Sequence, residues 1–233
     1  MKIKAHIPNT LTLLNLAFGV VGIIRVIDGN LYEGAIFVLV AAVLDFLDGF
    51  VARLLKAQSP IGKELDSLAD VVSFGVLPGI ILFEMTEQVT NSDWLPFLTL
   101  IVPMLSGYRL AKFNLDTRQS DRFIGLPTPA NALFISTLPF FFDQVEALQF
   151  LAQSPYFLVG LGWLMSLLLV AELPLIALKF KDFSFQNNRY RFGLIVLGMV
   201  ITALFQLAGI PLIILAYIGL SVLENIGSSA CVY

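Results

Sequence analysis

Histidine and cysteine are nearly absent from this chain, which has one of each in 233 residues. One cysteine cannot form a disulfide within the chain, and one histidine with one cysteine cannot assemble a zinc cluster. The motifs G-x4-G-K-[ST] and H-E-x2-H are also missing. Charged residues make up only 13% of the sequence and the net charge is −3, so no nucleic-acid partner is expected.

Apolar residues dominate instead: they make up 58% of the chain, and the mean hydropathy is +0.86. Crossing about 30 Å of hydrocarbon takes about 20 helical residues. Apolar segments separated by polar residues lie at about 9–27, 31–55, 68–85, 94–113, 127–142, 156–180, 192–208 and 210–226. The sequence therefore predicts an all-α, polytopic membrane bundle of about eight transmembrane helices. The first segment lacks a small-x-small cleavage site, so we expect a retained span rather than a signal peptide.

The basic residues give an independent test of this topology. If eight helices alternate in direction, every Lys and Arg except Arg25 falls at or near one side of the membrane. Cytoplasmic loops carry an excess of Lys and Arg, so this side is expected to be cytoplasmic. Both termini are then cytoplasmic too, and we expect a multi-pass protein of the cell (inner) membrane.

Four aspartates near this basic side are unexpected in so apolar a chain. Asp45 and Asp48 are three residues apart and share one face of the second predicted helix. Asp66 and Asp70 are four residues apart and share one face of the next. We expect a short turn around Gln58–Gly62 to join the two helices as antiparallel neighbours. The four carboxylates then lie at one level, where they repel one another unless a cation binds.

Oxygen ligands without histidine or cysteine suit hard cations, which here means Mg²⁺ or Mn²⁺, with Ca²⁺ also able to occupy the site. Two carboxylates on each of two facing helices suit one ion or two, as in two-metal phosphoryl transfer. An alternative is a structural ion-pair cluster in which Arg53 and Lys56 neutralise some of the acids. A second alternative is a transporter or channel with an acidic ion site, although no internal repeat is visible.

The same stretch carries a resemblance to a known family. Residues 45–70 fit D-x2-D-G-x2-A-R-x8-G-x3-D-x3-D at every fixed position, which resembles the CDP-alcohol phosphotransferase signature. The resemblance covers roughly residues 8–131 and continues more weakly beyond. It implies a single integral-membrane domain over residues 1–233, with a six-helix family core within about 8–208 and an extra C-terminal helix at about 210–226. It also implies a homodimer with its active site facing the cytoplasm.

For the site, the resemblance implies a CDP-activated lipid as the donor. It implies four metal ligands, one of which, Asp70, is also the base that deprotonates the acceptor alcohol; the set is Asp45, Asp48, Asp66 and Asp70. The positions that resemble the family's CDP-lipid contacts are Asn9, Thr12, Asp48, Gly49, Ala52, Arg53 and Ser59. For Asn9 and Thr12, helix capping is an alternative role. Without a side chain, Gly49 lets a nucleotide approach its helix closely.

Residues 62–76, the spacing Arg109-x4-Asn114 followed by Arg118, and residues 123–130 resemble the branch of the family that transfers phosphatidyl groups from CDP-diacylglycerol to L-serine, and residues 7–15 agree with it. A serine carboxylate needs a cation, and the guanidinium of Arg118, with Asn114 alongside, suits it. Glu172, which we expect inside the helix at 156–180, is a candidate because intramembrane carboxylates are often functional. The candidate acceptor contacts are therefore Arg109, Asn114, Arg118 and Glu172.

The acceptor is the less specific part of this interpretation. Glycerol 3-phosphate or inositol phosphate as acceptor, or an archaeal ether lipid as donor, stays open. A phosphate acceptor calls for a denser basic cluster than Arg118 with Asn114, which weakly favours serine.

Overall fold

The structure is a computed structural model that describes residues 6–115, 123–176 and 185–230. Almost all of these residues are helical. The helices are α1 (His6–Ile27), α2 (Leu31–Leu54), α3 (Pro60–Asp70), η2 (Val71–Val76), α4 (Leu77–Glu87), η3 (Leu95–Leu100), α5 (Ile101–Leu115), α6 (Thr128–Ser136), α7 (Leu138–Gln144), η4 (Glu146–Leu148), α8 (Gln149–Ala152), α9 (Pro155–Val170), α10 (Phe185–Phe205), η5 (Gln206–Gly209) and α11 (Ile210–Ala230). Two short strands, β1 (Phe123–Ile124) and β2 (Pro174–Leu175), join them. The helical bundle confirms the predicted fold class.

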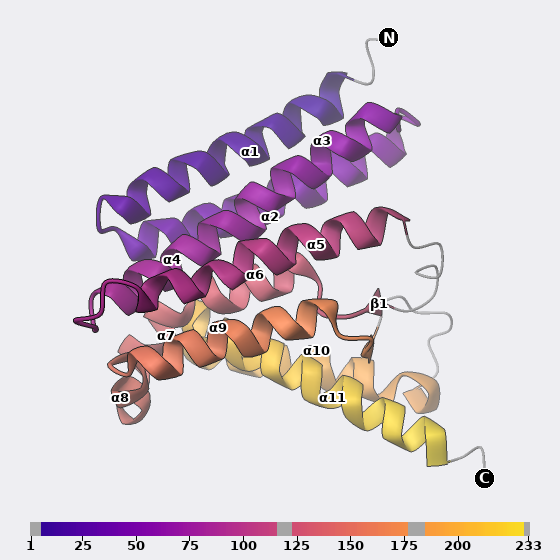
Figure 1. Ribbon diagram of the computed structural model, residues 1–233. Helices are drawn as coiled ribbons and strands as arrows, with labels where there is room; N and C mark the ends of the chain where they lie inside the picture. Colours follow the sequence, from indigo (N-terminus) through magenta and orange to yellow (C-terminus); the bar gives the residue numbers. More distant parts are fainter. Residues whose placement is uncertain (1–5, 116–122, 177–184, 231–233) are drawn as a thin grey trace.

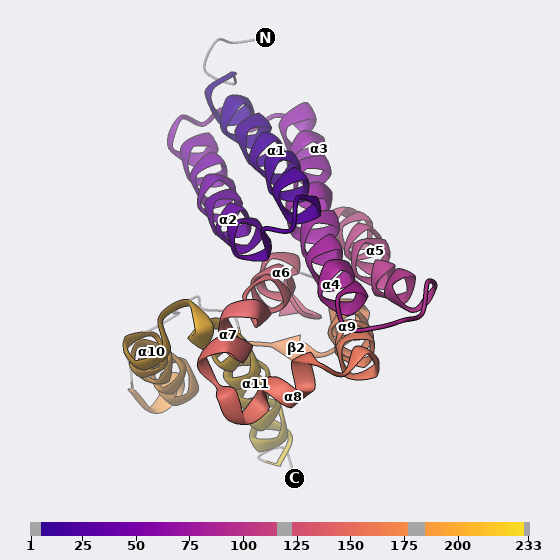
Figure 2. The same ribbon diagram turned by 90° about the vertical axis from the view of Figure 1, so that its left-hand side faces the viewer.

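The long helices form a bundle in which the N-terminal and C-terminal helices lie on opposite sides. Helices α1 and α2 form an antiparallel hairpin that packs against the continuous α3–η2–α4 segment (Figure 1). Helices α5 and α9 lie against that segment, and α6 lies between it and α11. Figure 2 shows α10 and α11 on the opposite side of the molecule from α1. The segment that carries Asp66 and Asp70 is therefore at the centre of the bundle.

This central segment starts earlier than the sequence predicts. The third apolar stretch is expected at 68–85, after a turn around Gln58–Gly62, but the helix begins at Pro60 and runs to Glu87. Ser59 caps it by accepting a hydrogen bond from the Gly62 backbone N–H at 3.1 Å, and a proline at the first helical position favours the start. Directly after Asp70 the helix widens into the π-helical turn η2, a distortion that often marks functional sites.

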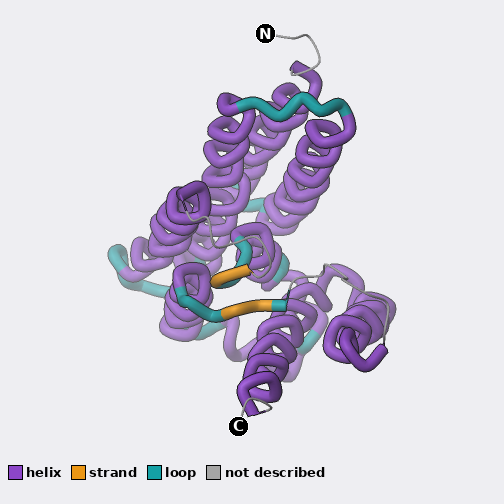
Figure 3. The backbone as a smooth tube through the Cα atoms, turned by 90° about the vertical axis from the view of Figure 1, so that its right-hand side faces the viewer, coloured by secondary structure: helices purple, strands orange, loops and turns teal. Residues whose placement is uncertain are grey.

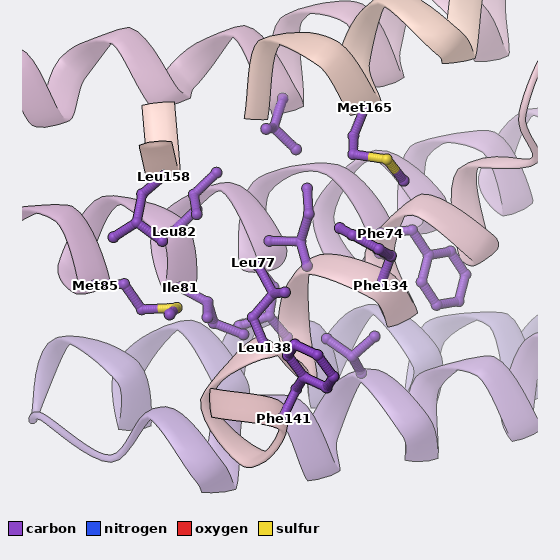
Figure 4. Close-up of a cluster of buried hydrophobic side chains, with 14 of the residues drawn as sticks. Phe74, Leu77, Ile81, Leu82, Met85, Phe134, Leu138, Phe141, Leu158 and Met165 are labelled. Atoms are coloured by element: carbon purple, nitrogen blue, oxygen red, sulfur yellow. The ribbon is translucent and has the colours of Figure 1, made fainter. Parts of the chain in front are cut away.

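The core of the bundle is apolar and centres on η2 and α4 (Figure 4). Side chains from α6, α7 and α9 pack around it. The fully buried members include Phe74, Leu77, Ile81, Leu82, Ile135, Leu158 and Met165. Small residues bring α4 and α5 together, because a Cβ at Gly79 would lie 2.7 Å from Pro103 Cδ. Gly75, one turn earlier, also approaches α5, since a Cβ there would lie 3.1 Å from Ser106 Cβ.

A short antiparallel ladder interrupts the helical pattern, and the sequence did not predict it. Helix α9 ends at Val170, not near residue 180 as expected, and β2 pairs with β1 in the register Phe123↔Leu175. Pro174, which has no N–H to continue a helix, begins β2. Figure 3 shows the two strands side by side among the helices. Gly125, with φ +77°, follows β1 directly against the end of α9.

The number of membrane spans stays a prediction. Four stretches are long and apolar enough to cross a membrane, or five if a pair bent by 87° counts as one span. The four stretches are His6–Ile27, Leu31–Leu54, Pro60–Glu87 and Asn188–Ile226, and the bent pair is Glu146–Ala152 with Pro155–Val170. Large apolar side chains such as Phe46 and Leu68, each 64% exposed, face outwards as lipid-facing residues do. These features identify a multi-pass membrane protein.

Candidate active site

Three carboxylates from α2 and α3 meet at one end of the bundle. Ligand oxygens of Asp45, Asp48 and Asp66 all lie within 4.8 Å of one another. The carboxyl groups of Asp45 and Asp66 thus face each other across the helix pair. Two carboxylates this close require a shared proton or a cation between them. The predicted grouping on two facing helices is confirmed for these three residues.

The fourth aspartate, Asp70, lies one turn further along α3 and deeper in the bundle. It is 9% exposed, and its Oδ1 atom has no hydrogen-bond partner among the described residues. Its charge interacts with those of the other three aspartates and with that of Arg109 on α5. Asp70 is thus adjacent to the three-carboxylate group rather than a full member of it.

The three-carboxylate group fits a divalent cation. Within the described residues, no Lys or Arg nitrogen lies within 4.0 Å of any of the four aspartates, so the ion-pair alternative with Arg53 and Lys56 finds no support. Asp66 Oδ1 is also buried without a partner. Clustered, uncompensated carboxylate oxygens are the ligands that Mg²⁺ and Mn²⁺ prefer. The residues present therefore suit such an ion.

A cavity of about 600 Å³ opens beside this group, between the N-terminal part of α1, the end of α2 and the start of α3. All seven predicted CDP-lipid contacts line it. The remaining lining residues are Pro8, Ala57, Gln58, Pro60, Gly62, Lys63 and Asp66. Arg53 and Lys63 bring positive charge to a wall that also carries two of the carboxylates. Such a cavity suits a ligand that carries both anionic groups and a bound cation.

Small residues and one hydrogen bond shape the cavity. Thr12 Oγ1 donates to Asp48 Oδ2 at 2.5 Å and so fixes one carboxylate at the cavity wall. A Cβ on Gly62 would lie 3.0 Å from both Asn9 Oδ1 and Ser59 Oγ. Gly49 leaves more room, since its nearest neighbour would be an Arg53 guanidinium nitrogen at 3.9 Å. The absence of a side chain at these two positions keeps the cavity open, and for Gly49 this agrees with the role that the sequence predicts.

Unlike the CDP-lipid contacts, the predicted acceptor contacts do not line one cavity together. Arg109 is buried and donates from Nη1 to Thr128 Oγ1 at 3.0 Å. Asn114, at the end of α5, instead donates from Nδ2 to Ser67 Oγ at 2.8 Å. Its backbone carbonyl accepts a hydrogen bond from Lys63 Nζ. Arg118 lies outside the described residues.

Glu172 does not occupy the intramembrane position that the sequence predicts. Because α9 ends at Val170, Glu172 lies in the connection to β2 with its side chain 69% exposed. Its carboxylate pairs with Lys112 Nζ at 3.7 Å. An exposed ion pair of this kind makes a small contribution to stability, and the prediction that Glu172 lies within a membrane helix is wrong.

Comparison with known proteins now adds to this geometry. The profile of the family described as CDP-alcohol phosphatidyltransferase matches residues 5–171, which include the whole aspartate cluster and all seven cavity residues. The chain belongs to this family. The match extends well beyond the stretch at 8–131 on which the sequence resemblance is strongest.

Three relatives illustrate the similarity to this family. A CDP-diacylglycerol–serine O-phosphatidyltransferase of Bacillus subtilis is 31% identical over 60% of this chain and 78% of its own length. A protein of the same name from Mycobacterium leprae is 36% identical over 55% of this chain, but over only 45% of its own length. An archaetidylserine synthase of Methanothermobacter thermautotrophicus is 36% identical over 60% of this chain and 61% of its own length.

The structure also brings polar residues to the site that the sequence analysis did not single out. Asn15 lies one turn after Thr12 on the same face of α1, is fully buried, and has no partner for either side-chain amide atom. Its backbone carbonyl accepts a hydrogen bond from Ser73, one turn beyond Asp70. An amide in the middle of an apolar helix was the available signal. For Thr128, the partner of Arg109, no such signal existed.

Proposed function

We propose that this protein transfers the phosphatidyl group of CDP-diacylglycerol to the hydroxyl of L-serine, which yields phosphatidylserine and CMP. The observation that carries the proposal is the continuity of the cavity with the aspartate cluster: one wall is shared by the nucleotide contacts and the carboxylates. The names of the Bacillus subtilis and Mycobacterium leprae relatives support this donor and acceptor.

Asp70 is the general base in this proposal. Its buried Oδ1 has no partner among the described residues and is free to accept the serine hydroxyl proton. The hydroxyl oxygen then forms a bond to the phosphorus that carries the diacylglycerol. The bond from this phosphorus to the oxygen that bridges to CMP breaks, and CMP leaves with that oxygen. A positioned base of this kind contributes about 10²–10⁴-fold to a rate.

Asp45, Asp48 and Asp66 would hold Mg²⁺ or Mn²⁺, with Asp70 as a further ligand if a second ion binds. When bound, such a cation neutralises charge on the diphosphate oxygens of the donor. Thr12 orients Asp48 through its 2.5 Å hydrogen bond. The two glycines leave space for the nucleotide, and the Arg53 guanidinium lies in the same wall to pair with phosphate oxygens.

A second donor class is favoured by one observation. The relative from Methanothermobacter thermautotrophicus is named archaetidylserine synthase, and its identity to this chain is as high as that of the Mycobacterium leprae protein. Serine is the shared acceptor in these names. The same chemistry with an ether-lipid donor is therefore the alternative function.

We further propose that the protein lies in the cell membrane with the aspartate cluster at the cytoplasmic side, and that it forms a homodimer. The distribution of Lys and Arg supports the orientation. In Figure 1 the start of α1 and the end of α11 both lie at the right-hand end of the bundle, which supports an even number of spans. Family membership supports the dimer.

An acceptor series tests the function. Purified protein would receive CDP-diacylglycerol, Mn²⁺ or Mg²⁺, and either L-serine, glycerol 3-phosphate or inositol phosphate, and the release of CMP would be measured. We expect release with L-serine that stops when a chelator is added. CMP release with glycerol 3-phosphate but not with serine would contradict the proposal that serine is the acceptor. CMP release that a chelator does not affect would contradict the proposal that a metal is required.

A further inference from the structure

A second polar cluster, centred on Arg109, lies next to Asp70. The Arg109 side chain is only 8% exposed, and its charge interacts with Asp70 and with Tyr217 of α11. Its Nη1 donates to Thr128, but its Nε has no partner in the described part of the chain. No carboxylate of the described residues lies within 4.0 Å of it. A buried guanidinium without an anion is strongly unfavourable, so this position suits a ligand that supplies one.

An unpartnered amide lies on the same helix as Thr128, the hydrogen-bond partner of Arg109. Asn131 is fully buried, and neither its Nδ2 nor its Oδ1 has a partner within the described ranges. It is three residues after Thr128 on α6, so the two side chains share one face of that helix. Buried polar groups are almost always hydrogen-bonded, and an amide left with four unused bonds is exceptional. Arg109 and Asn131 therefore offer unused donors and an acceptor in the same part of the bundle.

Helix α11 closes this part of the bundle. The Tyr217 hydroxyl donates to the carbonyl of Ile176 at 3.1 Å, and the Ile176 backbone N–H donates to Ser221 Oγ at 3.1 Å. These bonds hold the chain just after β2, whose partner β1 leads into the start of α6. Residues beyond the segment that matches the family, 5–171, thus contact both the strand pair and α6, the helix that carries Thr128.

We infer that Arg109 and Asn131 form the subsite for the amino-acid part of the acceptor, with Arg109 binding its carboxylate and Asn131 Oδ1 accepting from its ammonium. The inference rests on the proposed function and names the residues that select the acceptor. Arg109 carries a planar fork of donors that matches a carboxylate. Because Arg109 is close enough to Asp70 for their charges to interact, a serine whose carboxylate binds Arg109 would present its hydroxyl to Asp70. Thr128 positions the guanidinium and does not itself touch the substrate.

Two analogues of serine test the subsite in the wild-type protein. Serinol keeps the ammonium and a hydroxyl but lacks the carboxylate, and 3-hydroxypropionate keeps the carboxylate but lacks the ammonium. We expect kcat/KM for each to fall at least about tenfold below that for L-serine, as the loss of one charge-assisted hydrogen bond predicts. Equal use of serine and serinol would overturn the Arg109 assignment without any variant.

Two variants then assign the two contacts. Arg109→Gln should raise the KM for serine by at least about tenfold and remove the preference for serine over serinol. Asn131→Leu, similar in size, should raise the serine KM by about tenfold and remove the preference over 3-hydroxypropionate. Ser136→Ala is the matched control, since Ser136 is also on α6, fully buried and without a partner within the described residues. It should leave all three acceptors unchanged.

The KM for CDP-diacylglycerol provides the readout that separates binding from folding, and it should stay within about twofold of wild type in every variant. Equal losses for all three acceptors, or an unchanged serine KM, would overturn the inference alone. Wild-type protein that releases CMP with glycerol 3-phosphate but not with serine would overturn the proposed function together with the inference.

Discussion

The two charged regions of this protein are built in opposite ways. The aspartate cluster collects negative charge from two helices that are neighbours in the chain, and it borders an open cavity. The region around Arg109 holds one buried positive charge, and its polar neighbours come from α6 and α11, far along the sequence. Asp70 lies between the two and interacts with both.

This difference separates two tasks. Carboxylates beside a cavity suit a metal and a large anionic nucleotide, which enter from outside the bundle. A buried guanidinium and a buried amide suit a small zwitterion, because they replace the hydrogen bonds that its charged groups lose on leaving water. A base must take a proton from the acceptor and also lie next to the donor. Asp70, between the two regions, has this position.

Asp70→Asn breaks the link between the two regions and should have the largest effect. Because the amide cannot accept the hydroxyl proton, we expect kcat to fall by about 10²–10⁴-fold. Binding of CDP-diacylglycerol, measured by isothermal calorimetry, should change much less. A variant that folds normally and keeps wild-type turnover would remove Asp70 from its role as the base.

Asp66→Asn affects the acidic region alone. Loss of one of three clustered ligands should weaken Mn²⁺ binding by at least about tenfold, more than the loss of a group that only supports a ligand. Electron paramagnetic resonance of free Mn²⁺ measures this binding without substrate. The exposed Glu64→Gln, two residues away, is the control and should bind Mn²⁺ as wild type does. Equal binding by both variants would argue against the cluster as the metal site.

Gly62→Val narrows the cavity and leaves the Arg109 region untouched. Its side chain would press on Asn9 and Ser59, so the KM for CDP-diacylglycerol should rise about tenfold. Gly160→Ala on α9 is the control, because no atom lies within 4 Å of the added Cβ. If Gly62→Val raised the KM for serine but not the KM for CDP-diacylglycerol, the separation of the two regions would be contradicted.

Glu172→Gln should have the smallest effect. The exposed ion pair with Lys112 contributes less than about 1 kcal/mol, and the side chain lies outside both regions. We expect the serine KM to change less than about twofold in the same CMP-release assay. A tenfold rise would restore Glu172 as an acceptor contact.

The acidic region was predictable because its geometry is local. Helical spacing put each pair of aspartates on one face, and one short connection made the two helices neighbours. The signature around Gly49 and Arg53 then predicted a set of contacts for a CDP-activated lipid, and all of them line one cavity in the structure. Only the start of α3 was misplaced, because the polar residues before Asp66 do not resemble a membrane helix.

The acceptor region was not predictable in the same way, since its contacts join helices that are remote in sequence. Arg109 was among the predicted acceptor contacts, but only the structure shows that its guanidinium is buried. The prediction for Arg118 lies outside the described residues. Apolar residues before Pro174 suggested a continuous helix to 180, which placed Glu172 inside the membrane. Only the approach of Gly125 to the Leu169 carbonyl and the pairing of β2 with β1 show where that helix ends.

Direct transfer to the serine hydroxyl is the central claim, and an isotope label tests it. Purified protein would receive CDP-diacylglycerol, Mn²⁺ and L-serine labelled with oxygen-18 in its hydroxyl, and both products would be analysed by mass spectrometry. We predict that the label appears in phosphatidylserine and not in CMP, because the hydroxyl oxygen becomes the bridge to phosphorus. Phosphatidylserine without the label, or no phosphatidylserine at all, would contradict the account.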